Sequence, residues 1–75
     1  MKSFNQEREV LEEYKKLPKM NGWVVKRALV EALAKRWNIA LTSVYFHLER
    51  CLSNLDFEEI IIDRVKYIKI LGVKE

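Results

Sequence analysis

The stretch that decides the fold runs from Leu29 to Leu52 and reads LVEALAKRWNIALTSVYFHLERCL. Its apolar residues recur every three or four positions in two sets, which places each set on one face of a helix. Between the sets, Asn38 tolerates the left-handed conformation that often ends a helix. Thr42 and Ser43, just before the second set, supply the hydroxyl acceptor that suits a helix start. The pattern predicts two helices joined by a tight turn.

Residues 34–50, AKRWNIALTSVYFHLER, resemble the helix-turn-helix of winged helix-turn-helix transcriptional regulators. The match consists of a small residue, a bulky apolar residue, an aliphatic residue, a valine and a leucine, at Ala34, Trp37, Ile39, Val44 and Leu48. Asn38 stands where the family has glycine, and Cys51 where it has leucine; both replacements are physically mild. The resemblance implies an α+β fold of three helices, a short first strand and a C-terminal two-stranded wing.

The chain around this stretch fits one domain spanning residues 1–75. Ser3 and Gln6 form a capping-box signature for a helix from about Phe4, and Pro18 ends it. The predicted buried stripe of this helix comprises Val10, Leu11, Tyr14 and Leu17. On its other side, Glu12 and Lys16 are spaced for an ion pair. The resemblance implies that this helix also supports a homodimer.

The remaining segments include a turn, one segment with two possible structures, and two helices. Residues 19–22 have the composition of a turn. Trp23-Val24-Val25 is either a short strand or the start of the second helix, and the sequence leaves both open. A helix from Lys26 to Trp37 follows. The third helix covers roughly residues 41–53, with Asn54 as a candidate left-handed cap.

Residues 58–71 predict a hairpin, the wing of the family fold. Ile60 to Ile62 and Tyr67 to Leu71 have high strand propensity. The intervening residues 63–66 contain no glycine, so we expect a turn longer than two residues or less regular. Because side chains alternate along a strand, one face of the isoleucine run should be buried on the helices and at least one isoleucine should point outward.

The distribution of charge favours a polyanionic partner. The formal net charge is +3, and the excess of basic residues falls in residues 18–50, around the helix-turn-helix. A single cysteine excludes an internal disulfide. Nothing at the N-terminus resembles a signal peptide, and no apolar run approaches the length of a membrane span. We therefore expect a cytoplasmic protein without a membrane partner.

The third helix carries the functional hypothesis, which is sequence-specific binding of double-stranded DNA in the major groove by a transcriptional regulator. Its outward face should present two hydroxyls and two aromatic rings, which are costly to expose unless a partner covers them. The candidates for base contacts are Thr42, Ser43, Tyr45 and Phe46. The candidates for phosphate contacts, from the helices and the wing, are Lys26, Arg27, Lys35, Arg36, His47, Arg50, Arg64 and Lys66.

Other functions are less well supported by the residues. A winged-helix module that binds protein rather than DNA is the alternative, with Tyr45, Phe46 and a spare isoleucine as its contact patch. His47 and Cys51 lie four residues apart, which suits a metal or redox switch, but zinc would need two further ligands and the chain has no other histidine or cysteine. We expect no enzyme, no metal and no cofactor.

Overall fold

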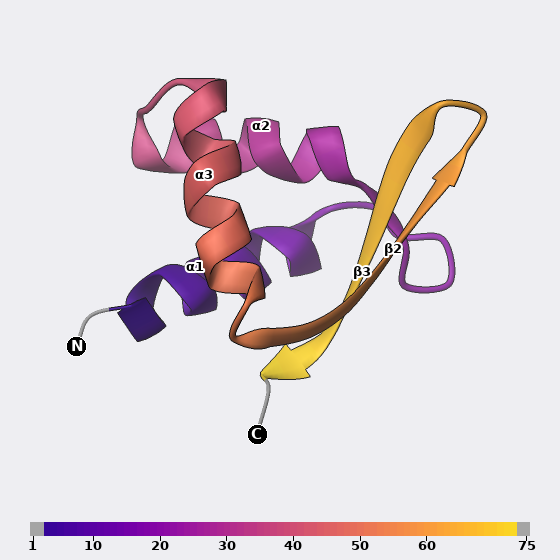
Figure 1. The fold of residues 1–75 in the computed structure, drawn as a ribbon, viewed down its shortest axis with the longest axis horizontal. Coiled ribbons are helices and arrows are strands. Elements are labelled where there is room, and N and C mark those ends of the chain that lie inside the picture. The colour runs from indigo at the N-terminus through magenta and orange to yellow at the C-terminus, as the bar shows by residue number, and fades with distance from the viewer. Residues whose placement is uncertain (1–2, 74–75) are drawn as a thin grey trace.

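The computed structural model describes residues 3–73, leaving out the side chains of residues 3–5 (Figure 1). Three helices are present, α1 (Ser3–Lys16), α2 (Lys26–Trp37) and α3 (Leu41–Leu52). Three strands, β1 (Val24–Val25), β2 (Leu55–Ile62) and β3 (Val65–Val73), form an antiparallel sheet in the order β1-β3-β2. The predicted α+β class is confirmed, and the arrangement is consistent with a winged-helix domain.

One core joins the helices to the near half of the sheet. Each predicted helix stripe is buried or half-buried in it, since side chains at helical spacing share one face. The buried apolar residues are Val10, Tyr14, Val24, Leu29, Val30, Leu33, Val44, Leu48, Cys51, Leu52, Leu55, Ile68 and Ile70. The Tyr14 hydroxyl donates a hydrogen bond to the Gly22 carbonyl, which ties α1 to the turn before β1. In the described part of the chain, no helix is long and apolar enough to cross a membrane.

The ends of the helices confirm some predictions and correct others. Asn38 has φ 57° and ψ 49° and ends α2 in the left-handed conformation, as predicted. The helix α3 begins at Leu41 as predicted, but the prediction of a hydroxyl cap is wrong: Thr42 and Ser43 lie inside its first turn, and its N-cap is Ala40, with no side-chain cap. Asn54 is also not left-handed; α3 ends at Ser53 in the right-handed region. The predicted capping box at Ser3 lies outside the described side chains.

The predicted ion pair between Glu12 and Lys16 is wrong. Lys16 instead lies 3.3 Å from Glu13, and Glu12 lies 2.9 Å from Arg36 of α2. The reason is tertiary: α2 packs beside α1 and offers a planar guanidinium that can bind two carboxylates. The acidic side of α1 therefore serves to hold α2.

The segment before α2 is a strand, which settles the alternative that the sequence left open. Val24 and Val25 pair with Ile68 and Tyr67 of β3. The preceding turn has positive φ at Asn21 and Gly22, as its composition predicted. This pairing makes β3 the central strand and leaves β2 at an edge.

The hairpin is longer and its turn tighter than predicted. Ile62 pairs with Val65, so the turn has only two residues, Asp63 and Arg64, with φ of 52° and 68°. Positive φ at both positions is the signature of the type I′ turn, whose twist matches that of the strands. The expectation of a longer or irregular turn is wrong, because aspartate tolerates the left-handed region and arginine is held there without glycine.

The expectation that one face of the isoleucine run would be buried is wrong as well. Ile60, Ile61 and Ile62 are exposed to 38%, 66% and 51%. The hairpin projects away from the three helices toward its turn (Figure 1), so no helix lies over its distal half. The sheet-facing side of the core is instead supplied by the proximal half, with Leu55, Ile68 and Ile70.

Candidate nucleic-acid interface

The outward face of α3 is open along its length. All four predicted base-contact residues, Thr42, Ser43, Tyr45 and Phe46, are exposed. The Phe46 side chain is exposed to 63% and that of Tyr45 to 39%. The opposite face, with Val44 and Leu48, is fully buried, so the helix cannot rotate to hide the aromatic rings. Two aromatic rings and two hydroxyls therefore stand on one rigid element.

Phe46 is oriented by its neighbours one turn away. The Arg50 guanidinium lies 5.9 Å from the centre of the Phe46 ring, within the range of a cation–π contact. His47 packs edge-on against both Phe46 and Trp37, with ring centres 5.7 and 6.1 Å away. The His47 ring is half-buried, and its Nδ1 is buried without a hydrogen-bond partner among the described residues. His47 therefore packs between Trp37 and the exposed Phe46 ring, and its own half-buried ring adds little to the exposed face.

A cleft of about 550 Å³ separates α3 from the hairpin. It brings together parts of the chain that lie far apart in sequence, the start of α2, the outward face of α3 and the beginning of β3. Its lining residues are Val25, Lys26, Arg27, Tyr45, Glu49, Arg64, Val65 and Lys66. Four of these are basic and one is acidic, so the cleft carries net positive charge.

Lys26 is a structural residue at the back of this cleft rather than a phosphate contact. It is only 5% exposed, and its Nζ lies 2.6 Å from Glu59 Oε2 of β2 and 3.3 Å from Glu49 Oε2 of α3. Burial by itself would lower the pKa of Lys26, but the hydrogen bonds and charges of Glu59 and Glu49 outweigh it and raise the pKa above its ordinary value. Lys26 thus joins the recognition helix to the hairpin and neutralises acids beside the cleft.

The other basic candidates divide between two places. Arg27, Arg64 and Lys66 are exposed at the cleft, although Arg27 lies 3.2 Å from Glu31 and Lys66 lies 3.9 Å from Glu59. Arg36 and Lys35 do not line it. Arg36 binds Glu12 and Glu13 of α1, and these pairs raise its pKa through hydrogen bonds to Glu13 and Glu12.

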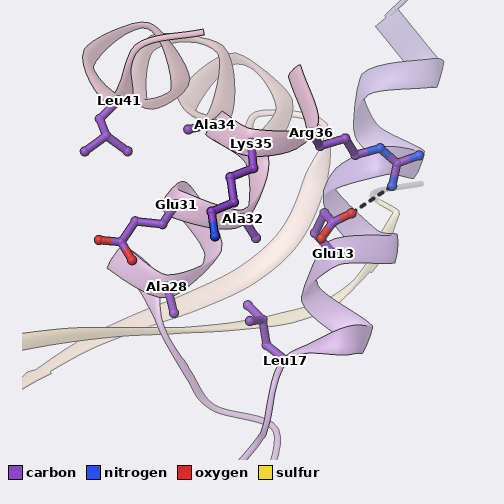
Figure 2. Close-up of a pocket in the computed structure, with 9 residues that line it drawn as sticks. All are labelled: Glu13, Leu17, Ala28, Glu31, Ala32, Ala34, Lys35, Arg36 and Leu41. Carbon is purple, nitrogen blue, oxygen red and sulfur yellow. Dashed lines mark hydrogen bonds and ion pairs between the residues drawn. The ribbon is translucent and has the colours of Figure 1, made fainter. Parts of the chain in front are cut away.

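Lys35 lines a separate groove of about 760 Å³ between α1 and α2. Figure 2 shows Lys35 and Arg36 leaving α2 in different directions, with Arg36 joined to Glu13 of α1. Leu17, just after α1, faces the alanines of α2. The structure therefore brings Arg27, Arg64 and Lys66 together at the cleft, places Arg50 on the α3 face beside it, and separates Lys35 and Arg36 from both.

Cys51 has the properties of an unreactive core thiol. It is 3% exposed, and burial, followed by the negative charge of Glu7, raises its pKa to about 11. A thiol with this pKa is protonated at neutral pH and is a poor nucleophile and metal ligand. Within residues 3–73, no three histidine, cysteine, aspartate or glutamate residues cluster as a metal site.

Sequence patterns missed three residues that shape the interface. Val25 and Val65 line the cleft because β1 stops short of the hairpin tip, and Glu59 anchors the hairpin through Lys26. Of the three residues, only Glu59 stands out in the sequence, as a charge inside the predicted hairpin. In the structure it pairs with Ile68, which is buried. A charge on the core-facing side of a strand needs a partner, and the sequence alone did not say which one.

The proposed dimer surface on α1 has little apolar area. The apolar side chains described for α1, Val10, Leu11 and Tyr14, pack into the core or against it, and its exposed residues are charged.

Comparison of the chain with protein-family models, with curated proteins and with solved structures found no match.

Proposed function

We propose that this chain is a sequence-specific, double-stranded DNA-binding transcriptional regulator of the winged-helix type, acting in the cytoplasm. The observation that carries the proposal is the exposed α3 face of Thr42, Ser43, Tyr45 and Phe46, which stands beside a basic cleft. An α-helix fits the major groove, where hydroxyls can bond base edges and an aromatic ring can contact thymine methyl groups.

The charges around α3 match the needs of a phosphate backbone. Arg27 of α2 flanks the cleft on one wall, and Arg64 of the hairpin turn and Lys66 of β3 flank it on the other. Glu49, the acid on the α3 face, is paired with Lys26 and so repels a phosphate less. Phosphate contacts on either side of the helix would fix its register, and the α3 side chains would then read the sequence.

Fluorescence anisotropy with labelled duplexes tests the proposal. We expect binding to random DNA and tighter binding to DNA from upstream of the chain's own gene. With about six phosphate contacts in a dimeric complex, the affinity should fall roughly a thousand-fold between 50 and 200 mM salt. Binding that does not respond to salt, or no binding at low salt, would contradict the proposal.

Two substitutions distinguish a residue that contacts phosphates from a residue that contacts bases. Arg64→Ala should weaken binding to all duplexes alike and reduce the salt dependence by about one phosphate. Phe46→Ala should cost about 1–3 kcal/mol on the preferred duplex and little on random DNA. Lys15→Ala serves as the matched control, because Lys15 is an exposed lysine of α1 that does not line the cleft.

A protein-binding winged-helix module is the second candidate, and the exposed isoleucines of the hairpin favour it. Its affinity would survive high salt, because apolar contacts are not screened. Charge reversal of Lys35 and Arg36 is unsuitable as a discriminating change, because Arg36 holds α1. Arg64→Ala replaces it: this change should weaken DNA binding and leave an apolar interface nearly unchanged.

A further inference from the structure

The outer edge of β2 is an unprotected strand edge. β2 pairs only with β3, so one side of residues 55–62 is without a strand partner among the described residues. Proline and lysine, which often block such an edge, are absent from β2; three acids and a register shift between Asp56 and Phe57 lie in its proximal part. Its distal half is instead three consecutive exposed isoleucines, Ile60, Ile61 and Ile62. An edge of this kind is a template for pairing with another strand.

The hairpin turn fixes which backbone groups face that edge. Ile62 and Val65 flank a two-residue turn, so they form a hydrogen-bonded pair, and the pairs of Ile60 and Glu58 with β3 follow at every second position. The intervening residues, Ile61 and Glu59, therefore direct their N–H and C=O groups toward the open edge. Any strand added to β2 must bond these two residues.

The charges along β2 select the partner and its direction. The acids Asp56, Glu58 and Glu59 lie in the first five residues of the strand, and two of the hairpin's basic residues, Arg64 and Lys66, lie at its tip beside Asp63. A strand running antiparallel with the same sequence brings the acidic half of one copy alongside the basic tip of the other. A parallel copy would set acids against acids. This complementarity of the strand with its own reverse points to a second copy of the chain.

We propose that the chain forms a two-fold symmetric dimer by antiparallel pairing of β2 with β2 of a second copy, centred on Ile60. In this register Ile60 faces Ile60 of the second copy, and Ile61 lies opposite Glu59 of the second copy. The backbone groups that face the edge then meet, as an antiparallel ladder requires. No acid faces an acid, and the interface is isologous.

This dimer uses no residue of the α2 and α3 walls of the basic cleft, and no residue of β2 lines the cleft. On the hairpin wall, Arg64 of one copy would lie opposite Asp56 of the second copy. Because a two-fold axis normal to the joined sheet keeps the helices of both copies on one side of it, both α3 faces would be presented on that side. The inference does not depend on the proposed DNA binding, since it is tested without DNA.

Sedimentation equilibrium of the full chain over a range of concentrations is the first test, and we expect a reversible dimer. Ile60→Lys places two like charges on the two-fold axis and should raise the dimer dissociation constant at least about tenfold. Ile60→Glu should do the same. Leu71→Lys is the matched control: Leu71 is exposed to 57% on the central strand β3, away from the edge, and its substitution should leave the dimer intact.

Mixing the Ile60→Lys and Ile60→Glu variants tests the register itself. The two opposite charges then meet on the axis, and the mixture should regain the dimer that each variant alone has lost. The amide of Ile61 should in addition exchange more slowly with solvent as the concentration of the unmodified chain rises, whereas that of Ile60 should be protected throughout.

Three outcomes would overturn the proposal. One is an unmodified chain that stays monomeric at millimolar concentration. Another is a dimer that Leu71→Lys disrupts as strongly as Ile60→Lys does. The third is a mixture of the Lys and Glu variants that remains monomeric, which would exclude pairing centred on Ile60. Circular dichroism of each variant checks that the hairpin is still folded.

Discussion

The two halves of the C-terminal hairpin share a strand-forming, isoleucine-rich composition but differ completely in their surroundings. In the proximal half, Leu55, Ile68 and Ile70 are buried against the helices. In the distal half, Ile60 to Ile62 and Val65 stand in solvent. The difference comes from reach: the helices pack against the proximal part of the hairpin, and its distal part continues past them (Figure 1). Burial along a strand is thus decided by what packs over it rather than by its residues.

The largest effect should follow from truncation in the proximal half. Ile68 is fully buried on the central strand, so Ile68→Ala removes apolar contacts and leaves a cavity. We expect the free energy of unfolding, measured by urea denaturation, to fall by about 2–5 kcal/mol. Ile61→Ala is the control in the distal half and should change the stability of the monomer by less than about 0.5 kcal/mol. Similar losses for both variants would mean that the distal half is covered.

Lys26 joins the hairpin to the helices, and its loss should have the next largest effect. Lys26→Met keeps the apolar stem but leaves Glu59, whose side chain is only 26% exposed, without its closest cation. We expect a loss of about 1–3 kcal/mol in the free energy of unfolding. Arg27→Met is the matched control: its ion pair with Glu31 is exposed on both sides and should contribute little.

The pH dependence of this effect has a defined sign. The pKa of Lys26 is raised in the folded chain, so the charge on Lys26 and its ion pairs with the ionised glutamates contribute fully from neutral pH up to the ordinary pKa of lysine. Their contribution is lost as the pH rises through the raised value. The stability difference between Lys26→Met and the unmodified chain should therefore be constant across neutral pH and shrink only in strong alkali. A difference that shrinks near pH 7 would contradict this assignment.

Much of the helical half was predictable from the sequence because its signals are local. The spacing of Leu29, Leu33 and Trp37 defined the extent of α2, and Asn38 marked its end. The buried side of α3 followed from Val44 and Leu48 in the same way, and with it the exposure of the aromatic residues. Periodicity works here because a helix repeats its environment every turn.

The features that were missed depend on residues far apart in the chain. Lys26 and Glu59 are separated by 33 positions, and nothing near either residue indicates the other. The same holds for Arg36 and the acids of α1. The exposed isoleucines were misjudged because alternation predicts one buried face only where another element covers the strand. At the candidate site, the four α3 residues are exposed as predicted. The sequence did not indicate that Lys26 is buried in ion pairs at the back of the cleft, or that Lys35 and Arg36 lie away from it.

The smallest expected effect tests the tip of the distal half and separates its stability from its proposed DNA contact. Arg64 has φ 68°, where a residue with a Cβ is strained and glycine is not. Arg64→Gly creates an Asp-Gly turn, the sequence that type I′ hairpins prefer. We expect a gain of about 0.5–1 kcal/mol in the free energy of unfolding, because the relief of strain exceeds the entropy cost of glycine. The same variant should bind duplex DNA more weakly, as Arg64→Ala does, since both lack the guanidinium. A gain in stability with a loss of DNA affinity would show that Arg64 keeps a strained backbone conformation because its side chain contacts DNA. A fall in stability would instead show that the Arg64 side chain contributes to the fold.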